Sequence, residues 1–281
     1  MACKGARRKQ AKAEILMAEQ AKAKMNETAQ QTQPMTKQVT AQKVVEGLLF
    51  GVDSKFKTDT LLQNNLTLFE WAARNKIYPN FWGRNLVGEN ALSREEIDFI
   101  HSKGCKIAAI YTDNGAKETE EDGRILAKKI DLCAFELGVP EGTAIFLEIG
   151  ETEIATRNFM LGFISGMIDE GYIPGFKANT DAKFDFDREY SRGMQTDREL
   201  FAKCLIWAVA PSLPEYDRVT TTHLIHPDNW KPFAPSGITR KDIAVWQYGK
   251  NCHPIADDAD IETTFNINLV RNDKVIVEKM F

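Results

Sequence analysis

Short apolar runs alternate with segments of helical spacing from Val44 onward, and this alternation restricts the fold more than any other feature. The runs are apolar on both faces, which is typical of strands buried in a parallel sheet with helices between them. They occupy residues 46–54, 77–84, 105–115, 143–150, 172–179, 204–210, 219–226 and 242–249. The pattern predicts a TIM-like (β/α)8 barrel, in which some helices of the second half could be missing. A doubly wound open sheet is the alternative.

Motifs and composition exclude several other classes. No G-x-G-x-x-G follows the first run and no Walker loop occurs, which disfavours the open nucleotide-binding sheets. The five cysteines are scattered and form no C-x-x-C pair, so we expect reduced thiols packed in the core. A net charge of −4 gives no overall attraction to nucleic acid or to an anionic membrane. No apolar run is long enough to span a bilayer.

Residues 1–43 differ in composition from the rest, and we interpret them as a basic Ala/Lys/Gln-rich tail and linker before a barrel domain at 44–281. Residues 1–40 hold eight Lys or Arg against three Glu. They have too little apolar surface to offset the entropy cost of ordering. They also lack the apolar h-region of a signal peptide, so the default expectation is a cytoplasmic protein. An extracellular or cell-wall location would then need lysis or a non-standard route.

The segment 92–104 carries both end signals of a helix. Ser93 is a good N-cap, and Glu96 stands three residues later, as in a capping box. Gly104 follows the last position of helical spacing and favours termination there. We therefore predict a helix between the second and third strands.

Acidic side chains stand where several predicted strands end. Asp53, Asp113 and Glu148 each follow an apolar run, and the segment 246–248 ends the last predicted strand. In a parallel barrel the carboxyl ends of the strands meet at one mouth, which is where active sites form. We therefore expect these residues to open onto one cavity. The alternative for Glu148 is a buried acid satisfied by a neighbouring Lys or a backbone donor.

Aromatic and amide side chains near the same strand ends suit a sugar ligand, which presents apolar C–H faces and hydroxyl edges. Trp246, Gln247 and Tyr248 offer a stacking surface and an amide, although strand alternation lets only Trp246 and Tyr248 share a face. Trp82 and Arg84 are weaker candidates for the same role on the second strand. Core packing of Trp246 is the alternative.

An ordered set of motifs carries a family resemblance. It comprises "GVDS" at 51–54, the Phe-Trp-x-Arg-x-Leu pattern at 81–86, "LSREEIDFIHSKGCKIAAIY" at 92–111, "AFELGVPEGTAIFLEI" at 134–149, "EGYIPGF" at 170–176 and "DIAVWQYG" at 242–249. Together these resemble the glycoside-hydrolase-like domain of bacterial cell-surface proteins, a relative of the family-25 lysozymes. The resemblance implies a TIM-like barrel with an acidic, aromatic-lined groove for a glycan. We expect no cofactor and no metal.

The resemblance also implies candidate catalytic residues, and it departs from the family at one of them. Family-25 lysozymes end the fourth strand in Asp-x-Glu, where the Glu protonates the glycosidic oxygen. Here the Asp position is Glu148 and the Glu position is Gly150, so the expected general acid is absent. Glu151 or Glu153 could replace it from the loop, or could belong to the first turn of the next helix.

Other positions match the family pattern more directly. Asp53 corresponds to the Asp of the first strand, and Tyr111 and Asp113 correspond to polar positions after the third strand. Asp260 resembles a late Asp of the final segment. We therefore take Glu148, Asp53, Asp113 and Glu151 as candidate catalytic residues, and Tyr111 and Asp260 as candidate substrate-binding residues.

Two functions from different classes remain open. One is a glycoside hydrolase acting on peptidoglycan or a related polysaccharide; the other is a catalytically inactive barrel that binds a glycan or cell-wall fragment. A metal site at His223 and His226 is disfavoured because strand residues three apart face opposite sides. A thiol hydrolase at Cys252 and His253 is disfavoured because sequence neighbours rarely align as nucleophile and base. The sequence indicates neither the oligomeric state nor the particular glycan.

Overall fold

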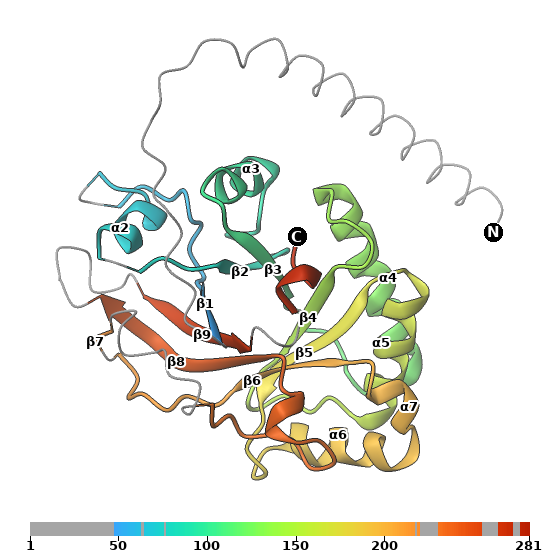
Figure 1. Ribbon diagram of the computed structural model, residues 1–281. Coiled ribbons are helices and arrows are strands. Elements are labelled where there is room, and N and C mark those ends of the chain that lie inside the picture. The colour runs from blue at the N-terminus through green and yellow to red at the C-terminus, as the bar shows by residue number, and fades with distance from the viewer. Residues whose placement is uncertain are drawn as a thin grey trace. The chain divides into compact units, whose positions relative to one another are not determined.

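The computed structural model describes residues 48–62, 65–75, 77–216, 218–219, 230–254, 264–271 and 276–281. Within them, eight strands form a closed α/β barrel (Figure 1), as predicted. Around the barrel they are β6 (Leu205–Val209), β5 (Ile173–Asn179), β4 (Ala144–Ile149), β3 (Lys106–Tyr111), β2 (Phe81–Asn85), β1 (Leu48–Asp53), β9 (Phe265–Arg271) and β8 (Val245–Pro254). Pairing of β6 with β8 closes the ring. The predicted tail and linker at 1–43 lie outside the described residues.

The strand directions differ from the all-parallel prediction at one place. β1 to β6 and β8 pair in parallel, and they coincide with seven of the predicted apolar runs. β9 was not predicted, and it runs antiparallel to both β1 and β8. The remaining predicted strand, 219–226, lies outside the described residues except for Val219. That residue belongs to the short β7 (Arg218–Val219), which pairs with the C-terminal end of β8.

Helices follow most strands of the first half. They are α2 (Leu68–Arg74), α3 (Arg94–Ser102), α4 (Glu120–Leu137), α5 (Arg157–Asp169), α6 (Asp185–Thr196) and α7 (Arg198–Phe201). Figure 1 shows α4 and α5 side by side on the outside of the barrel. Between β6 and β8 the described residues contain the short strand β7 and one 3-10 turn, η3 (Arg240–Asp242). After β6 the described part of the chain therefore contains no α-helix.

Two predicted helix starts need correction. Ser93 caps α3 by accepting a hydrogen bond from the Glu96 amide, but the Glu96 carboxylate does not complete a capping box. It binds Arg84 instead, because a buried guanidinium needs a charged partner. Helix α5 begins at Arg157 and is capped by Thr156. Residues 151–153 therefore belong to the preceding loop and not to the first helical turn.

Aromatic rings fill the inside of the barrel. The inner cluster includes Phe81, Phe146, Trp207 and, from the C-terminal turn η5 (Ile276–Lys279), Ile276. Trp207 reaches across the interior to Gly83, where an added Cβ would lie 2.9 Å from the Trp207 ring. Such close approach requires glycine, because any side chain there would overlap the ring. A larger apolar cluster packs between the strands and the helices.

Candidate functional site

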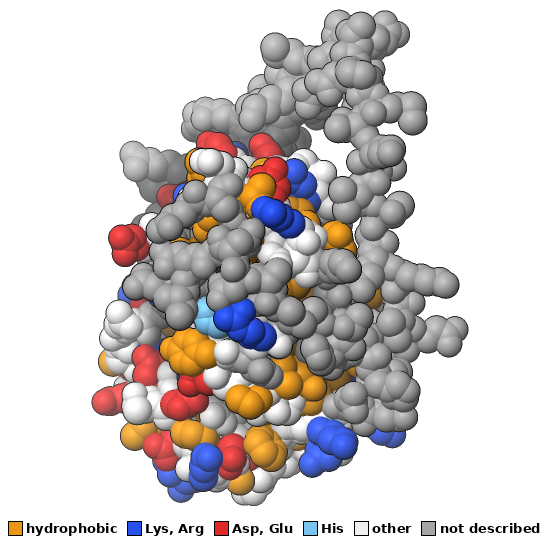
Figure 2. Space-filling model, turned by 90° about the vertical axis from the view of Figure 1, so that its left-hand side faces the viewer, with side chains coloured by type: hydrophobic (Ala, Val, Ile, Leu, Met, Phe, Trp, Pro, Cys, Tyr) orange, Lys and Arg blue, Asp and Glu red, His pale blue; other side chains and the backbone are white. Residues whose placement is uncertain are grey.

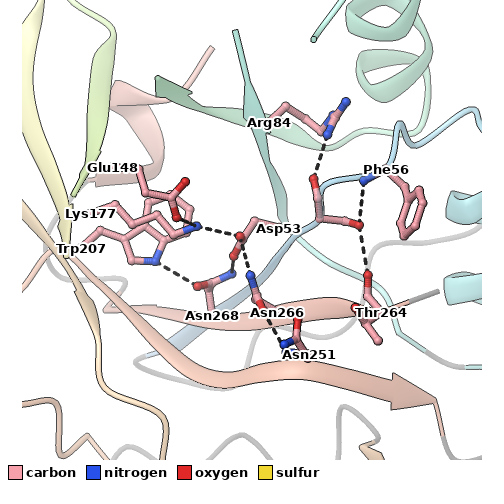
Figure 3. Close-up of polar contacts among 11 residues, drawn as sticks. Asp53, Phe56, Arg84, Glu148, Lys177, Trp207, Asn251, Thr264, Asn266 and Asn268 are labelled. Atoms are coloured by element: carbon pink, nitrogen blue, oxygen red, sulfur yellow. Dashed lines mark hydrogen bonds and ion pairs between the residues drawn. The ribbon is translucent and has the colours of Figure 1, made fainter. Parts of the chain in front are cut away.

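Asp53 lies at the carboxyl end of β1 and is almost fully buried, with 4% of its surface exposed. Its Oδ1 accepts a hydrogen bond from Asn268 Nδ2 at 2.7 Å. Its Oδ2 accepts from Asn266 Nδ2 at 2.9 Å and from Lys177 Nζ at 2.8 Å. Figure 3 shows the three donor side chains, from β5 and β9, converging on the carboxylate at the end of β1. Three donors therefore hold this carboxylate in place.

Lys177 connects Asp53 to the carboxylate of Glu148. Its ammonium lies 3.2 Å from Glu148 Oε1, and it also lies over the Trp207 ring, 5.2 Å from the centroid (Figure 3). Burial lowers the pKa of Lys177, but the charges and hydrogen bonds of Asp53 and Glu148 outweigh burial, and the net effect raises it. Lys177 is therefore an ammonium ion at neutral pH. One buried cation bridges the two strand-end carboxylates.

The two asparagines come from β9, and sequence reasoning missed both them and Lys177. Asn268 also accepts a hydrogen bond from Trp207 Nε1 at 3.0 Å, and Asn266 Oδ1 accepts from the Asn251 amide at 3.0 Å. The signal was present in residues 265–270, where Asn and apolar residues alternate. Strict alternation is typical of a strand with one polar face. A Lys inside the apolar run 172–179 was the corresponding signal for Lys177.

Glu148 is the more accessible of the two bridged acids. It lies on β4 next to Lys177 on β5, and 35% of its side chain is exposed. The structure therefore places Asp53 and Glu148 at the same end of the barrel, joined through Lys177. The ion pair with Lys177 also agrees with the alternative stated for Glu148 in the sequence analysis, in which a neighbouring lysine pairs with this acid.

The other acids after β4 lie in its loop. Glu151 is exposed and accepts a hydrogen bond from Asn179 at 3.1 Å. Glu153 Oε2 accepts from the amide of Gly150 at 2.8 Å, and Glu153 Oε1 lies 3.5 Å from Lys117 Nζ. Glu153 therefore stabilises the loop that contains Gly150, whereas Glu151 stands at the rim.

The two candidates at the end of β3, Tyr111 and Asp113, lie in different parts of the barrel. Asp113 Oδ2 accepts a hydrogen bond from the Gly115 amide at 2.8 Å, which fixes the loop turn. Tyr111 is buried in the cluster between strands and helices, on the face of β3 that does not line the barrel. Burial raises the pKa of its hydroxyl. Asp113 therefore lies in a loop at the mouth, and the Tyr111 ring packs outside the barrel.

Arg84 and Trp82 on β2 have no exposed surface. Arg84 is oriented by Glu96, whose Oε1 lies 2.8 Å from Arg84 Nε, and it donates to the carbonyl oxygens of Ser54 and Asn90. Its guanidinium therefore braces the chain just beyond Asp53. Trp82 lies in the outer cluster. Neither side chain offers the ligand surface that the sequence suggested.

The segment 246–248 divides between the two faces of β8. Trp246 is 1% exposed, packs in the outer cluster and donates its indole N–H to Ala210 O at 2.7 Å. Tyr248 is half-buried and meets Trp246 edge to face, with centroids 4.8 Å apart. Core packing thus accounts for Trp246.

Gln247 faces the barrel interior, beside Asn268 in the β8–β9 register. It is 2% exposed, and its Oε1 accepts no hydrogen bond from the described residues. This is the member of the segment that reaches the mouth. Asp260 and both His223 and His226 lie outside the described residues.

No group of three or more His, Cys, Asp or Glu among the described residues is arranged to hold a metal ion. None of the helices described combines the length and apolar character needed to cross a bilayer.

The described strands and helices define a closed α/β barrel with a charged, amide-rich mouth. Solved structures share this fold. An uncharacterized protein from B. stearothermophilus aligns over 83% of this chain and 100% of its own, with 23% identity and a TM-score of 0.66. The spore cortex lytic enzyme SleM of Clostridium perfringens aligns over 85% of this chain and 69% of its own, with 12% identity and a TM-score of 0.51.

At these identities the similarity shows the fold alone, and it confirms the barrel implied by the resemblance. No family model matches the sequence, and no curated protein matches it.

Proposed function

We propose that the protein binds a glycan, such as peptidoglycan or a related polysaccharide, at the mouth of the barrel and does not cleave it by a lysozyme-type mechanism. The observation that carries this proposal is the bridge from Asp53 through Lys177 to Glu148. The fold supports a glycan as the ligand, because one solved structure that shares it is named as a spore cortex lytic enzyme.

The chemistry of glycoside hydrolysis explains why the bridge favours binding. The reaction usually needs one carboxyl group that donates a proton and a second that is ionised. Both oxygens of Asp53 accept hydrogen bonds from neighbouring protein donors, so this carboxyl group is directed at protein groups and not at a leaving group. Glu148 shares the same ammonium ion, and Gly150 carries no side chain.

A second candidate, a glycoside hydrolase with a relocated acid, has one observation in its favour. Glu151 is exposed at the rim of the mouth and accepts a hydrogen bond from the Asn179 side chain. A loop glutamate in this position could protonate a leaving group once a glycan is bound. Glu148 could then serve as the ionised carboxylate.

Parallel assays of binding and cleavage separate the two candidates. The purified protein is incubated with insoluble peptidoglycan and with soluble chitooligosaccharides, and pelleted protein and new reducing ends are measured. We expect binding without cleavage, and weaker binding for Glu148→Gln. Cleavage that is abolished by Glu151→Gln would establish the second candidate. Absence of binding to either glycan would contradict both.

A further inference from the structure

The mouth of the barrel presents acceptors that lack donors. Gln247 Oε1 and Asn85 Oδ1 are buried, and neither accepts a hydrogen bond from the described residues. Both residues lie on the inner face, since Asn85 follows Phe81 and Gly83 by strand alternation and Gln247 follows Val245. A buried acceptor without a donor is unfavourable, so a ligand that supplies the donor is stabilised by satisfying it.

Four donor side chains of the same mouth are directed at protein groups. Lys177 donates to Asp53 and pairs with Glu148, and Trp207 donates to Asn268. The amide groups of Asn266 and Asn268 both donate to Asp53. A ligand carbonyl that approached these donors would have to compete with these contacts, whereas a ligand ammonium would meet the partly exposed carboxylate of Glu148.

The charge of the mouth also favours a ligand that donates hydrogen bonds, in particular a cationic one. In the described part of the inner face, the carboxyl groups of Asp53 and Glu148 outnumber the cation between them, the Lys177 ammonium, by one. Glu151 adds a further carboxyl group at the rim. Glu148 is the partly exposed member, and only its Oε1 pairs with Lys177. A cationic donor would therefore be attracted to Glu148.

We infer, on the basis of the proposed function, that the mouth selects amino sugars whose nitrogen is a free ammonium group over sugars whose nitrogen is acetylated. An ammonium supplies three donors and a positive charge, which suit the Glu148 carboxylate and the amide oxygen of Gln247. An N-acetyl group is neutral, supplies one donor and adds a carbonyl acceptor. The substrate class is thus a de-N-acetylated glycan.

Calorimetric titration with two hexasaccharides of equal length tests this inference. One is a hexamer of glucosamine and the other a hexamer of N-acetylglucosamine, both at mildly acidic pH, where the amino groups are charged. We expect the glucosamine hexamer to bind about tenfold or more tightly, a difference of about 1.4 kcal/mol or more, because its ammonium group forms a charge-assisted hydrogen bond. Glu148→Gln should reduce this ratio to near one.

The control is Glu199→Gln, an exposed acid on α7 just before β6 and thus at the opposite end of the barrel. It should leave the ratio unchanged; an equal fall in this control would mean general charge attraction and would overturn the inference. Equal or tighter binding of the acetylated hexamer by the unmodified protein would also overturn it, while the proposed function would stand. Failure of both hexamers to bind would contradict the inference and the proposed function together.

Discussion

At the scale of single residues, Lys177 determines what the mouth can do. Its ammonium is 4% exposed and compensates Asp53, which is equally buried, at 2.8 Å. A buried charge that loses its partner is costly, whereas a pair removed together leaves little cost. The same ammonium also sets the charge that a ligand meets at Glu148. Stability and ligand preference therefore depend on one side chain.

Replacing Lys177 tests this dependence. We expect Lys177→Met to lower the free energy of unfolding by about 3–5 kcal/mol, because Asp53 is left as an uncompensated buried charge. The same change made in an Asp53→Asn background should cost much less. Denaturant titration of both single variants and the double variant gives the coupling free energy. Additive losses would show that the two groups do not interact in the folded protein.

Gln247 should show the opposite relation between stability and binding. Gln247→Met removes a buried acceptor that has no donor, so we expect the free energy of unfolding to rise by about 1–3 kcal/mol. Binding of a glycan should weaken in the same variant. Gln195→Met, on the exposed face of α6, is the control and should change stability by less than about 0.5 kcal/mol. A destabilised Gln247→Met would mean that the amide has a structural partner.

Some of these residues could be predicted from the sequence and others could not. Asp53 and Glu148 were found because each ends an apolar run, and strand ends meet in a parallel barrel. Lys177 was hidden inside a run assigned as apolar. Trp246 was ambiguous, because alternation places neighbours on opposite faces without saying which face is inside. Its neighbour Gln247 is the one that faces the interior.

At the scale of secondary-structure elements, the ion pair between Arg84 on β2 and Glu96 on α3 fixes the chain that follows β1. Arg84 donates to Ser54 O at 2.8 Å, and Glu96 Oε1 accepts from both the amide and the hydroxyl of Thr58. Ser54 Oγ in turn donates to Thr264 O, just before β9 (Figure 3). The pair thus joins four segments around the end of β1.

Removing one side of this pair should loosen the segment after β1. We expect Glu96→Leu to cost about 3–5 kcal/mol, because the Arg84 guanidinium is left buried without a counterion. The amide of Thr58 should exchange with solvent faster, since it loses its acceptor. Hydrogen exchange measured by mass spectrometry, with Arg84→Met/Glu96→Leu as the matched variant, checks both effects. Unchanged protection at Thr58 would contradict this role for Glu96.

The elements themselves were predictable to different degrees. Apolar runs located β1 to β6 and β8, because buried parallel strands have a continuous apolar signature. β9 was missed, since its alternating Asn and apolar residues do not form such a run. The capping box of α3 was predicted from local spacing, but the long-range need of Arg84 for a carboxylate outweighed it. Sequence patterns within one helical turn cannot reveal that Glu96 pairs with Arg84, twelve residues earlier in the chain.

At the scale of the whole molecule, the barrel is closed by contacts from both ends of the described chain. β9 joins β1 to β8, and the C-terminal Phe281 exchanges backbone hydrogen bonds with Ile107 at the start of β3. The interior is filled at that end by Ile276 and Met280, which leaves the polar groups at the opposite end. The surface seen in Figure 2 mixes hydrophobic, basic and acidic side chains in its described part.

The predicted tail provides a test of the domain boundary. Deleting residues 1–40 should leave the thermal midpoint nearly unchanged, because their composition offers too little apolar surface to pack on a barrel. Differential scanning calorimetry of both chain lengths measures this. A fall of the thermal midpoint by more than about 4 °C would correspond to a loss of about 1 kcal/mol or more in unfolding free energy for a domain of this size. That result would mean that the barrel domain begins before residue 41.

A single NMR sample tests the central claim most directly, because it reports on the protein and on the sugar together. The isotope-labelled protein is mixed with a partly N-acetylated amino-sugar oligomer and followed over a day. We expect shifts of the Gln247 side-chain amide and the Trp207 indole signals, while the oligomer signals stay intact. Conversion of the oligomer into shorter sugars would contradict binding without cleavage, and unshifted Gln247 and Trp207 signals would contradict a ligand site at the mouth.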